Sequence, residues 1–190
     1  TKKYEQIFSL AEIEFLITVY WPFLIPKSIF TLSEKTINFH PAFLPVNRGW
    51  YPHVHSILDN SISGVTIHEI SEKADQGDIW SQKEIEILPW ETAGDVYVKL
   101  QHQIFKLFCD SWHAIVNGEL KPFPQNNLRA NYHSKSEINL LDEIDLTKSF
   151  SGKTFINLLR ARTFGEKSYA YFKMDNKKYF VRIIITPEKT

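Results

Sequence analysis

The stretch TINFHP, residues 36–41, decides the fold because a strand-like run ends there in residues capable of chemistry. Its β-branched and aromatic residues predict a short strand, and Pro41 and Pro45 exclude its continuation as a central strand. The earlier run IEFLITVY, residues 13–20, is typical of a strand buried on both faces. We therefore predict an α/β fold: a mostly parallel sheet flanked by helices, with both runs in the same sheet.

Downstream of these strands, the pattern predicts a helix, two strands and a second, longer helix. Residues 52–60 begin with a proline that suits the first turn of a helix. The runs at 63–70 (SGVTIHEI) and 79–88 (IWSQKEIEIL) alternate in polarity and flank a turn-rich segment, which predicts an antiparallel pair. Thr92 is a candidate N-cap for a long helix, whose apolar stripe ends near Gly118.

Composition and turn signals divide the chain into three parts. Residues 1–125 hold the predicted sheet, residues 126–150 form a polar linker, and residues 151–190 form a small C-terminal α+β unit. That unit is expected to contain a helix over 153–163, starting near Ser151, and a hairpin of strands 169–174 and 179–185. A lone hairpin cannot bury so apolar a second strand, which predicts a homodimer.

The composition is that of a globular chain without a global charge. Among 190 residues, 22 Lys+Arg balance 22 Asp+Glu, so no overall field attracts nucleic acid or an anionic membrane. No apolar run approaches the roughly 20 residues of a membrane span. The lone cysteine, Cys109, is expected in the core of the long helix and cannot form an internal disulfide. These features predict a cytoplasmic protein; since the only methionine is Met174, the natural N-terminus is expected before Thr1.

Three polar residues are candidates for chemistry at the end of the 36–40 run. Asn38 and His40 stand two apart, so their side chains leave the same face at the strand's carboxyl end, where open α/β sheets bind ligands. An imidazole there can exchange a proton, and an amide NH2 can bind a developing oxyanion. Asp75 is the candidate carboxylate for holding the imidazole. Taken singly, each residue favours a structural interpretation, whereas the ordered set favours a site.

The ordered motifs resemble those of the formyltransferases that use 10-formyltetrahydrofolate. They are Asn38-Phe39-His40-Pro41, Leu44-Pro45, Arg48-Gly49, Gly64-Val65-Thr66-Ile67-His68 and Asp75-Gln76-Gly77. The resemblance covers about residues 13–125 and implies a Rossmann-like sheet whose N-terminal part is missing from this chain. It also implies 10-formyltetrahydrofolate as the formyl donor. No metal is expected, and His53, His55, His102, His113 and His133 are interpreted as structural.

The resemblance assigns roles to three groups of residues. Asn38, His40 and Asp75 would be the catalytic trio. The folate pterin would be held mainly by backbone groups of Tyr20, Trp21, Pro22, Phe23, Leu24, Ala74 and Gly77. The acceptor would contact Arg48, Gly49, Trp50, Tyr51, His68, Arg160 and Arg162, where aromatic faces suit a sugar or base and guanidinium forks suit a diphosphate. For the arginines of the helix and for Trp50, a packed structural role is an equally good interpretation.

Three acceptors are usual in this family. Residues 47–53, residues 158–164 and the terminal hairpin look most like the N-formyltransferases of nucleotide-linked, dTDP-type deoxyamino sugars in bacterial surface-polysaccharide (O-antigen) pathways. The glycinamide enzyme typically ends soon after the long helix. The methionyl-tRNA enzyme resembles a longer chain with a basic second domain, whereas residues 133–190 carry 11 Lys+Arg and 7 Asp+Glu. A tRNA-type enzyme and a non-catalytic remnant that binds folate or a sugar nucleotide remain as alternatives.

Overall fold

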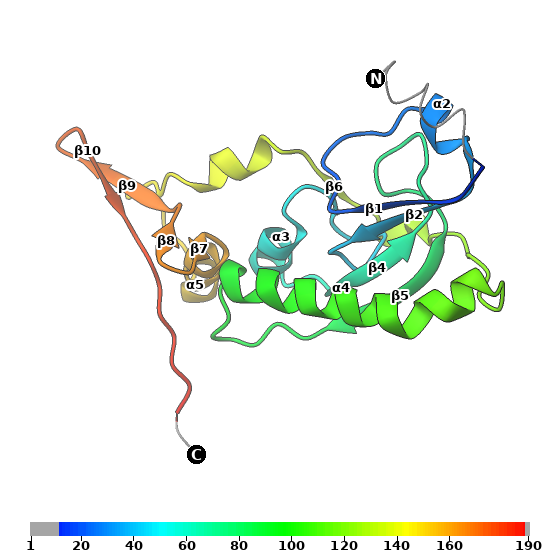
Figure 1. Cartoon of the computed structure of the whole chain (residues 1–190). Helices are drawn as coiled ribbons and strands as arrows, with labels where there is room; N and C mark the ends of the chain where they lie inside the picture. Colours follow the sequence, from blue (N-terminus) through cyan, green and yellow to red (C-terminus); the bar gives the residue numbers. More distant parts are fainter. Residues whose placement is uncertain (1–11, 189–190) are drawn as a thin grey trace.

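A four-stranded sheet forms the centre of the structure, a computed structural model that describes residues 12–188 (Figure 1). The strand order is β1 (Ile13–Val19), β2 (Ser33–His40), β4 (Ser63–His68) and β5 (Ile79–Ile85), and α2 (Lys27–Phe30) lies between β1 and β2 in the chain. β1 and β2 are parallel, and β4 is antiparallel to both β2 and β5. Three of these four strands thus point one way and β4 is reversed. The predicted α/β fold, with the first two runs in one sheet, is confirmed.

The long helix α4 (Ala93–Val116) lies along one face of the sheet. As predicted, Thr92 begins it: the Thr92 N–H donates to Asp95 Oδ2 at 2.8 Å, one bond of a capping box. Cys109 is exposed, so its expected place in the core is wrong. The reason is the helical period, which turns Leu107 and Ser111 toward the sheet and Cys109 toward the opposite side of the helix. Within residues 12–188, neither α4 nor another helix is long and apolar enough to cross a membrane.

Both faces of the central strands are covered. Ile37, Val65 and Ile67 are fully buried in one cluster with the apolar stripe of α4. On the other face, Thr66 Oγ1 donates to the carbonyl of Ala42 at 2.7 Å and accepts the Leu44 N–H at 3.2 Å. The loop that follows β2 therefore covers the face opposite α4. Along β2 and β4, core residues alternate with residues that face this loop.

The predicted linker carries ordered structure of its own. It contains η1 (Asn127–Arg129), β6 (Tyr132–His133) and η2 (Glu137–Leu141). β6 pairs in parallel with β3 (Arg48–Gly49), which precedes helix α3 (Pro52–Asp59). Ile138 belongs to the main hydrophobic core. This part of the chain thus packs alongside β3 instead of spanning a gap.

The C-terminal part joins the rest through α5 (Gly152–Ala161), which packs against α3. Ser151 Oγ accepts the Thr154 N–H at 3.1 Å, the cap predicted for this helix. Two antiparallel hairpins follow: β7 (Thr163–Phe164) pairs with β8 (Lys167–Ser168), and β9 (Tyr171–Met174) pairs with β10 (Lys177–Phe180). The hairpin of β9 and β10 projects from the molecule (Figure 1). The predicted strand over 179–185 is wrong in extent: β10 ends at Phe180, and Val181 and Ile183 pack against a small core beside α5.

Candidate active site

Polar side chains gather on the face of the sheet opposite α4, at the ends of β2 and β4. Asn38 and His68 are opposite each other across the two strands, and Asn38 Nδ2 lies 3.0 Å from His68 Nε2. His68 Nδ1 lies 2.7 Å from the carbonyl oxygen of Glu69, so Nδ1 carries the hydrogen and Nε2 accepts from the amide. Asn38 and His40 line the same cavity, as their two-residue spacing predicts.

Thr18, on β1, sets the orientation of the Asn38 amide. The parallel register places Thr18 beside Asn38, and Thr18 Oγ1 donates to Asn38 Oδ1 at 2.8 Å. With its carbonyl end held in this way, the amide turns its NH2 toward His68. No motif in the sequence marks Thr18, since only the register of the two strands shows the contact.

Asp75 approaches the same face from the loop between β4 and β5, with a left-handed backbone (φ 55°). Its Oδ1 lies 3.6 Å from both His40 Nδ1 and His68 Nε2. Its Oδ2 accepts the Gly49 N–H at 2.8 Å. Burial acts to raise the pKa of Asp75, but the two imidazoles and the Gly49 N–H outweigh it and hold that pKa well below its usual value. Asp75 is therefore an anion that contacts both histidines and the loop.

His40 lies between two hydrogen-bond acceptors. Its Nε2 is 3.5 Å from the Asn47 carbonyl oxygen, and its Nδ1 faces Asp75. Burial lowers the pKa of His40 against the opposing effect of Asp75, so the resting ring is neutral at pH 7. Because both neighbours accept, a ring that gains a second proton finds a partner at either nitrogen. This environment allows His40 to take up a proton and release it.

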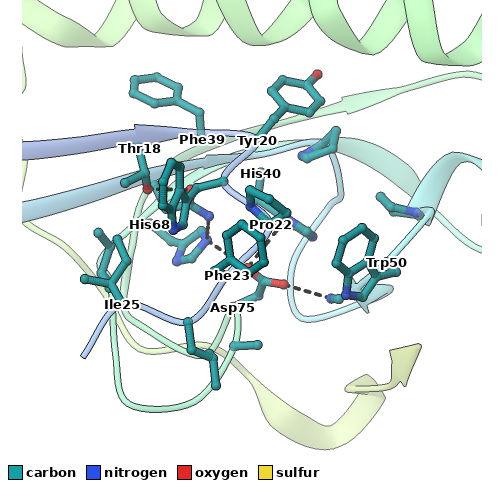
Figure 2. Close-up of a pocket in the computed structure, with 18 of the residues that line it drawn as sticks. Thr18, Tyr20, Pro22, Phe23, Ile25, Phe39, His40, Trp50, His68 and Asp75 are labelled. Atoms are coloured by element: carbon teal, nitrogen blue, oxygen red, sulfur yellow. Dashed lines mark hydrogen bonds and ion pairs between the residues drawn. The ribbon is translucent and has the colours of Figure 1, made fainter. Parts of the chain in front are cut away.

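A cavity of about 370 Å³ opens over these residues (Figure 2). Asn38, His40, His68 and Asp75 line its polar side. Six of the residues predicted to hold a pterin also line it: Tyr20, Trp21, Pro22, Phe23, Leu24 and Ala74. Trp21, Phe23 and Leu24 are 55%, 71% and 65% exposed, so their apolar surface is available to a ligand. One cavity thus combines a polar side with an apolar one.

Gly77, the seventh predicted pterin residue, is not among the residues that line the cavity. Its carbonyl accepts from Gln125 Nε2 at 2.7 Å, and a Cβ on it would lie 2.0 Å from the Glu69 carbonyl oxygen. The position therefore requires glycine because the two loop segments approach closely. Its role in the structure is to shape the loop that carries Asp75.

Of the predicted acceptor residues, Gly49, Trp50, Tyr51 and His68 line the cavity. Arg48 does not: its guanidinium is buried and donates to Gln125 Oε1 at 2.5 Å and to Asn127 Oδ1 at 2.6 Å. Gln125 also donates to the Asp75 carbonyl at 2.9 Å. Arg48 therefore supports the loop through Gln125, a residue that no motif in the sequence marked.

Arg160 and Arg162 are also internal. Arg160 donates to the carbonyl oxygens of Glu91 and Leu88 at 2.9 and 2.7 Å. Arg162 is 5% exposed and pairs with Asp142. Both side chains are buried and donate to partners inside the protein, which favours the structural interpretation of these two arginines; their assignment to the phosphates stays a prediction. The cavity is instead completed by Tyr97 and Tyr132, which sequence reasoning missed because neither adjoins a motif.

A sheet of this kind, with Asn, His and Asp gathered beside an apolar cavity, is the arrangement expected of a formyl-transferring protein. Residues 2–111 match the family model described as formyl transferase. Residues 137–187 match a second model, the N-formyltransferase dimerization C-terminal domain. The chain belongs to the formyltransferase family.

Individual proteins that are similar to this chain support the same family. The dTDP-4-amino-4,6-dideoxyglucose formyltransferase of Mycobacterium tuberculosis is 36% identical over 159 residues, which cover 82% of this chain and 66% of the relative. A crystal structure of a Mycobacterium tuberculosis protein superposes with a TM-score of 0.92 at 30% identity, over 100% of this chain and 80% of that one. The N-formyltransferase of Helicobacter canadensis, in complex with folinic acid and dTDP-3-aminofucose, superposes with a TM-score of 0.76 at 27% identity, over 92% and 63%. The chain spans just under two thirds of the curated relative.

Proposed function

We propose that the chain transfers the formyl group of 10-formyltetrahydrofolate to the amino group of a dTDP-linked deoxyamino sugar. The observation that carries this proposal is the convergence of Asn38, His40 and Asp75 on the polar side of a cavity whose other side is apolar. The names of the relatives support the substrate class: one relative is a formyltransferase of a dTDP-amino sugar, and a solved structure contains folinic acid with another dTDP-amino sugar.

The apolar side of the cavity suits the pterin of the donor. Trp21, Phe23 and Leu24 offer exposed apolar surface that a flat heterocycle would bury. The polar edge of the heterocycle would bind backbone groups of the same segment and of Ala74. Such recognition requires a particular backbone conformation. It requires of the side chains only that they are apolar.

The polar side suits the chemistry of acyl transfer. The neutral sugar amine attacks the formyl carbon, a C–N bond forms, and the carbonyl oxygen becomes an oxyanion. Asn38 Nδ2 carries two hydrogens. One of them is donated to His68, and the other is available to this oxyanion. His40 takes a proton from the new ammonium nitrogen and returns it to the folate nitrogen, which leaves as the second C–N bond breaks. Asp75 stabilises the imidazolium while the ring holds that proton.

The acceptor would lie against Trp50 and Tyr51, whose rings suit a sugar or a base. Because the three predicted arginines are internal, the diphosphate needs another cation. Lys73 lines the cavity, and Lys135 Nζ lies 4.7 Å from the centre of the Trp50 ring. We assign the phosphate contacts to these two lysines.

The proposal includes a homodimer that acts in the cytoplasm, in a bacterial surface-polysaccharide pathway. The matched C-terminal family is named for dimerization. Exposed apolar side chains gather in the same part of the chain: Tyr169, Met174, Tyr179, Phe180 and Ile184. We keep the division into a catalytic part (1–125), a linking part (126–150) and a C-terminal unit (151–190). Neither a membrane nor a nucleic acid is a proposed partner.

Incubation with 10-formyltetrahydrofolate and a panel of nucleotide-linked amino sugars tests the function. The panel should include dTDP-4-amino-4,6-dideoxyglucose, a dTDP-3-amino sugar and a UDP-amino sugar, and mass spectrometry should detect the gain of one formyl group. We expect formylation of a dTDP-amino sugar by the wild type and its loss in His40→Asn. Formylation of methionyl-tRNA in place of every sugar would reject the proposed acceptor. Folate binding without any transfer would support a non-catalytic remnant instead.

A further inference from the structure

A second cluster of ligand-type side chains lies outside the candidate active site. It contains His55 on α3, His133 on β6 and Glu137 at the start of η2, and one ligand atom of each lies within 4.8 Å of the others. We propose that these residues bind a Zn2+ ion that clamps α3 to the segment from β6 to η2. No spacing in the sequence predicts this grouping, because 78 positions separate the two histidines, far more than in any metal-ligand motif.

His55 supplies a buried nitrogen without a partner. The residue is 7% exposed, and its Nε2 makes no hydrogen bond within the described residues. A buried polar atom without a hydrogen bond lowers the stability of a folded protein by about 1–3 kcal/mol, so such an atom needs an explanation. Burial and the neighbouring His133 lower the pKa of His55 to about 4, which leaves the ring neutral at pH 7. A neutral imidazole is the form that binds metal.

His133 can present a ligand nitrogen to the same cluster. Its Nε2 lies 3.1 Å from both Asn131 Nδ2, a donor, and Asn47 Oδ1, an acceptor, so either tautomer has a partner there. With the hydrogen on Nε2, the ring donates to Asn47 and turns the lone pair of Nδ1 toward Glu137, 2.9 Å away. Metal-bound imidazoles are commonly held by such a bond to a carbonyl oxygen.

Glu137 completes the set with a negative charge. Its Oε1 accepts the Ser134 N–H at 2.8 Å, which orients the carboxylate and leaves Oε2 for a cation. That N–H is the largest of the effects that lower the pKa of Glu137 to about 2, so the carboxylate is ionised. Two imidazole nitrogens and one carboxylate oxygen form a ligand set that Zn2+ takes, with a water molecule in the fourth position.

The two imidazole rings are stacked, with centroids 3.5 Å apart and planes 5° from parallel. Nitrogen lone pairs lie in the ring plane, so both nitrogens can reach one ion only if a ring tilts out of the stack. His133 is the more exposed of the two rings, with a side chain that is 16% exposed, so it is the ring that we expect to tilt. Binding should therefore replace the stacked pair with two rings that point at a common centre.

Such an ion would stiffen one wall of the cavity. β6 pairs with β3 through Arg48 with Tyr132 and Gly49 with His133, and Tyr132 and Gly49 line the cavity. Gly49 also binds Asp75. A clamp between α3 and β6 would thus hold the wall that positions the carboxylate. The inference does not depend on the proposed formyl transfer.

Calorimetric titration of the full chain with ZnCl2 tests the site. The protein should carry no histidine tag and should first be stripped with EDTA and dialysed. We expect one Zn2+ per chain and a rise in the melting temperature on addition of zinc. Glu137→Gln and His133→Gln should weaken binding at least about tenfold. His113→Gln, at an exposed position of α4, is the matched control and should bind zinc like the wild type.

Glu137→Gln keeps the proposal testable if a histidine variant fails to fold, because the Glu137 side chain is 41% exposed. Absence of saturable binding by the wild type would overturn the proposal. Zinc binding that is unchanged in both Glu137→Gln and His133→Gln would also overturn it. A crystal grown with ZnCl2 should show the ion on His55, His133 and Glu137; rings that stay stacked beside no ion would leave only a His133–Glu137 hydrogen bond and reject the site.

Discussion

Asp75 and Gly49 are joined by a 2.8 Å hydrogen bond from the Gly49 N–H to Asp75 Oδ2. The other oxygen of the same carboxylate faces His40 and His68, 3.6 Å from each. Gly49 belongs to the strand that pairs with β6, and a Cβ on it would lie 2.4 Å from the His133 carbonyl oxygen. One carboxylate therefore links the two histidines to the position of the cavity wall.

Replacement of the two strand-end residues should reduce turnover without removing the donor site. His40→Asn removes the proton carrier and Asn38→Ala removes an oxyanion donor, so each should lower kcat by at least about a hundredfold. Folate affinity should stay within a few-fold, because the pterin is proposed to bind around Trp21 and Phe23. Steady-state kinetics and fluorescence titration with folinic acid measure the two effects. If His40→Asn kept most of its turnover, its role as proton carrier would be wrong.

Asp75→Asn should affect both chemistry and stability. We expect a fall in kcat of about a hundredfold and a loss of about 1–3 kcal/mol in the free energy of unfolding at pH 7, since a charged hydrogen-bond acceptor is lost. The pKa of Asp75 in the folded protein lies below its unfolded value of about 3.9. Its stabilising contribution is therefore present above about pH 4 and is lost as the pH falls through the folded pKa. Urea unfolding at pH 7 and pH 3 should show a smaller difference between wild type and variant at pH 3; a larger difference there would contradict the assignment.

Gly77→Ala should destabilise the loop that carries Asp75. The added methyl group would lie 2.0 Å from the Glu69 carbonyl oxygen, so one backbone segment must move, at a cost of about 1–3 kcal/mol. Gly152→Ala is the matched control, because a Cβ at position 152 meets no atom within 4 Å among the described residues. Thermal unfolding of both variants makes the comparison. Equal melting temperatures would show that the loop adapts to the methyl group.

Arg162→Met should act on stability and not on substrate binding. The guanidinium is 5% exposed and pairs with Asp142, so its removal leaves a partly buried carboxylate and should cost about 3 kcal/mol. Arg182→Met removes an ion pair with Glu166, whose side chain is 96% exposed, and should cost less than about 1 kcal/mol. Chemical denaturation tests both values. A normal stability combined with a raised KM for the sugar nucleotide would restore the phosphate-binding interpretation of Arg162.

Phe180→Glu should reduce association of the chain. Phe180 ends β10 and is 64% exposed within the hairpin assigned to the dimer contact. Burial of a charge in an apolar interface is unfavourable, so the variant should be a monomer at concentrations where the wild type is a dimer. Phe105→Glu, 68% exposed on α4, is the control and should leave the dimer intact. Light scattering across a dilution series distinguishes them; a wild type that is monomeric throughout would reject the dimer.

Local signals in the sequence were enough for most of the helices and strands. The β-branched run at 13–20, the Thr92 cap with its apolar stripe and the Ser151 cap all predicted elements that the structure contains. The burial predicted for the first run is wrong, because β1 is an edge strand of the described sheet and its Ile17 and Val19 are exposed. The period of a strand also showed that Asn38 and His40 leave one face. The candidate trio came from the resemblance together with this spacing. These inferences succeeded because they depend on neighbours within a few residues, where propensity and periodicity operate.

The sequence by itself therefore determined the α/β elements and the residues at the end of β2, whereas tertiary structure decided which side chains meet. Only strand register placed Thr18 against Asn38, and only the folded core showed that Arg160 and Arg162 donate to partners inside the protein. Only the packing of α3 beside β6 brought His55 to His133, from 78 positions away. The physical reason is that such contacts depend on how distant segments pack, and no local period of the chain records that packing.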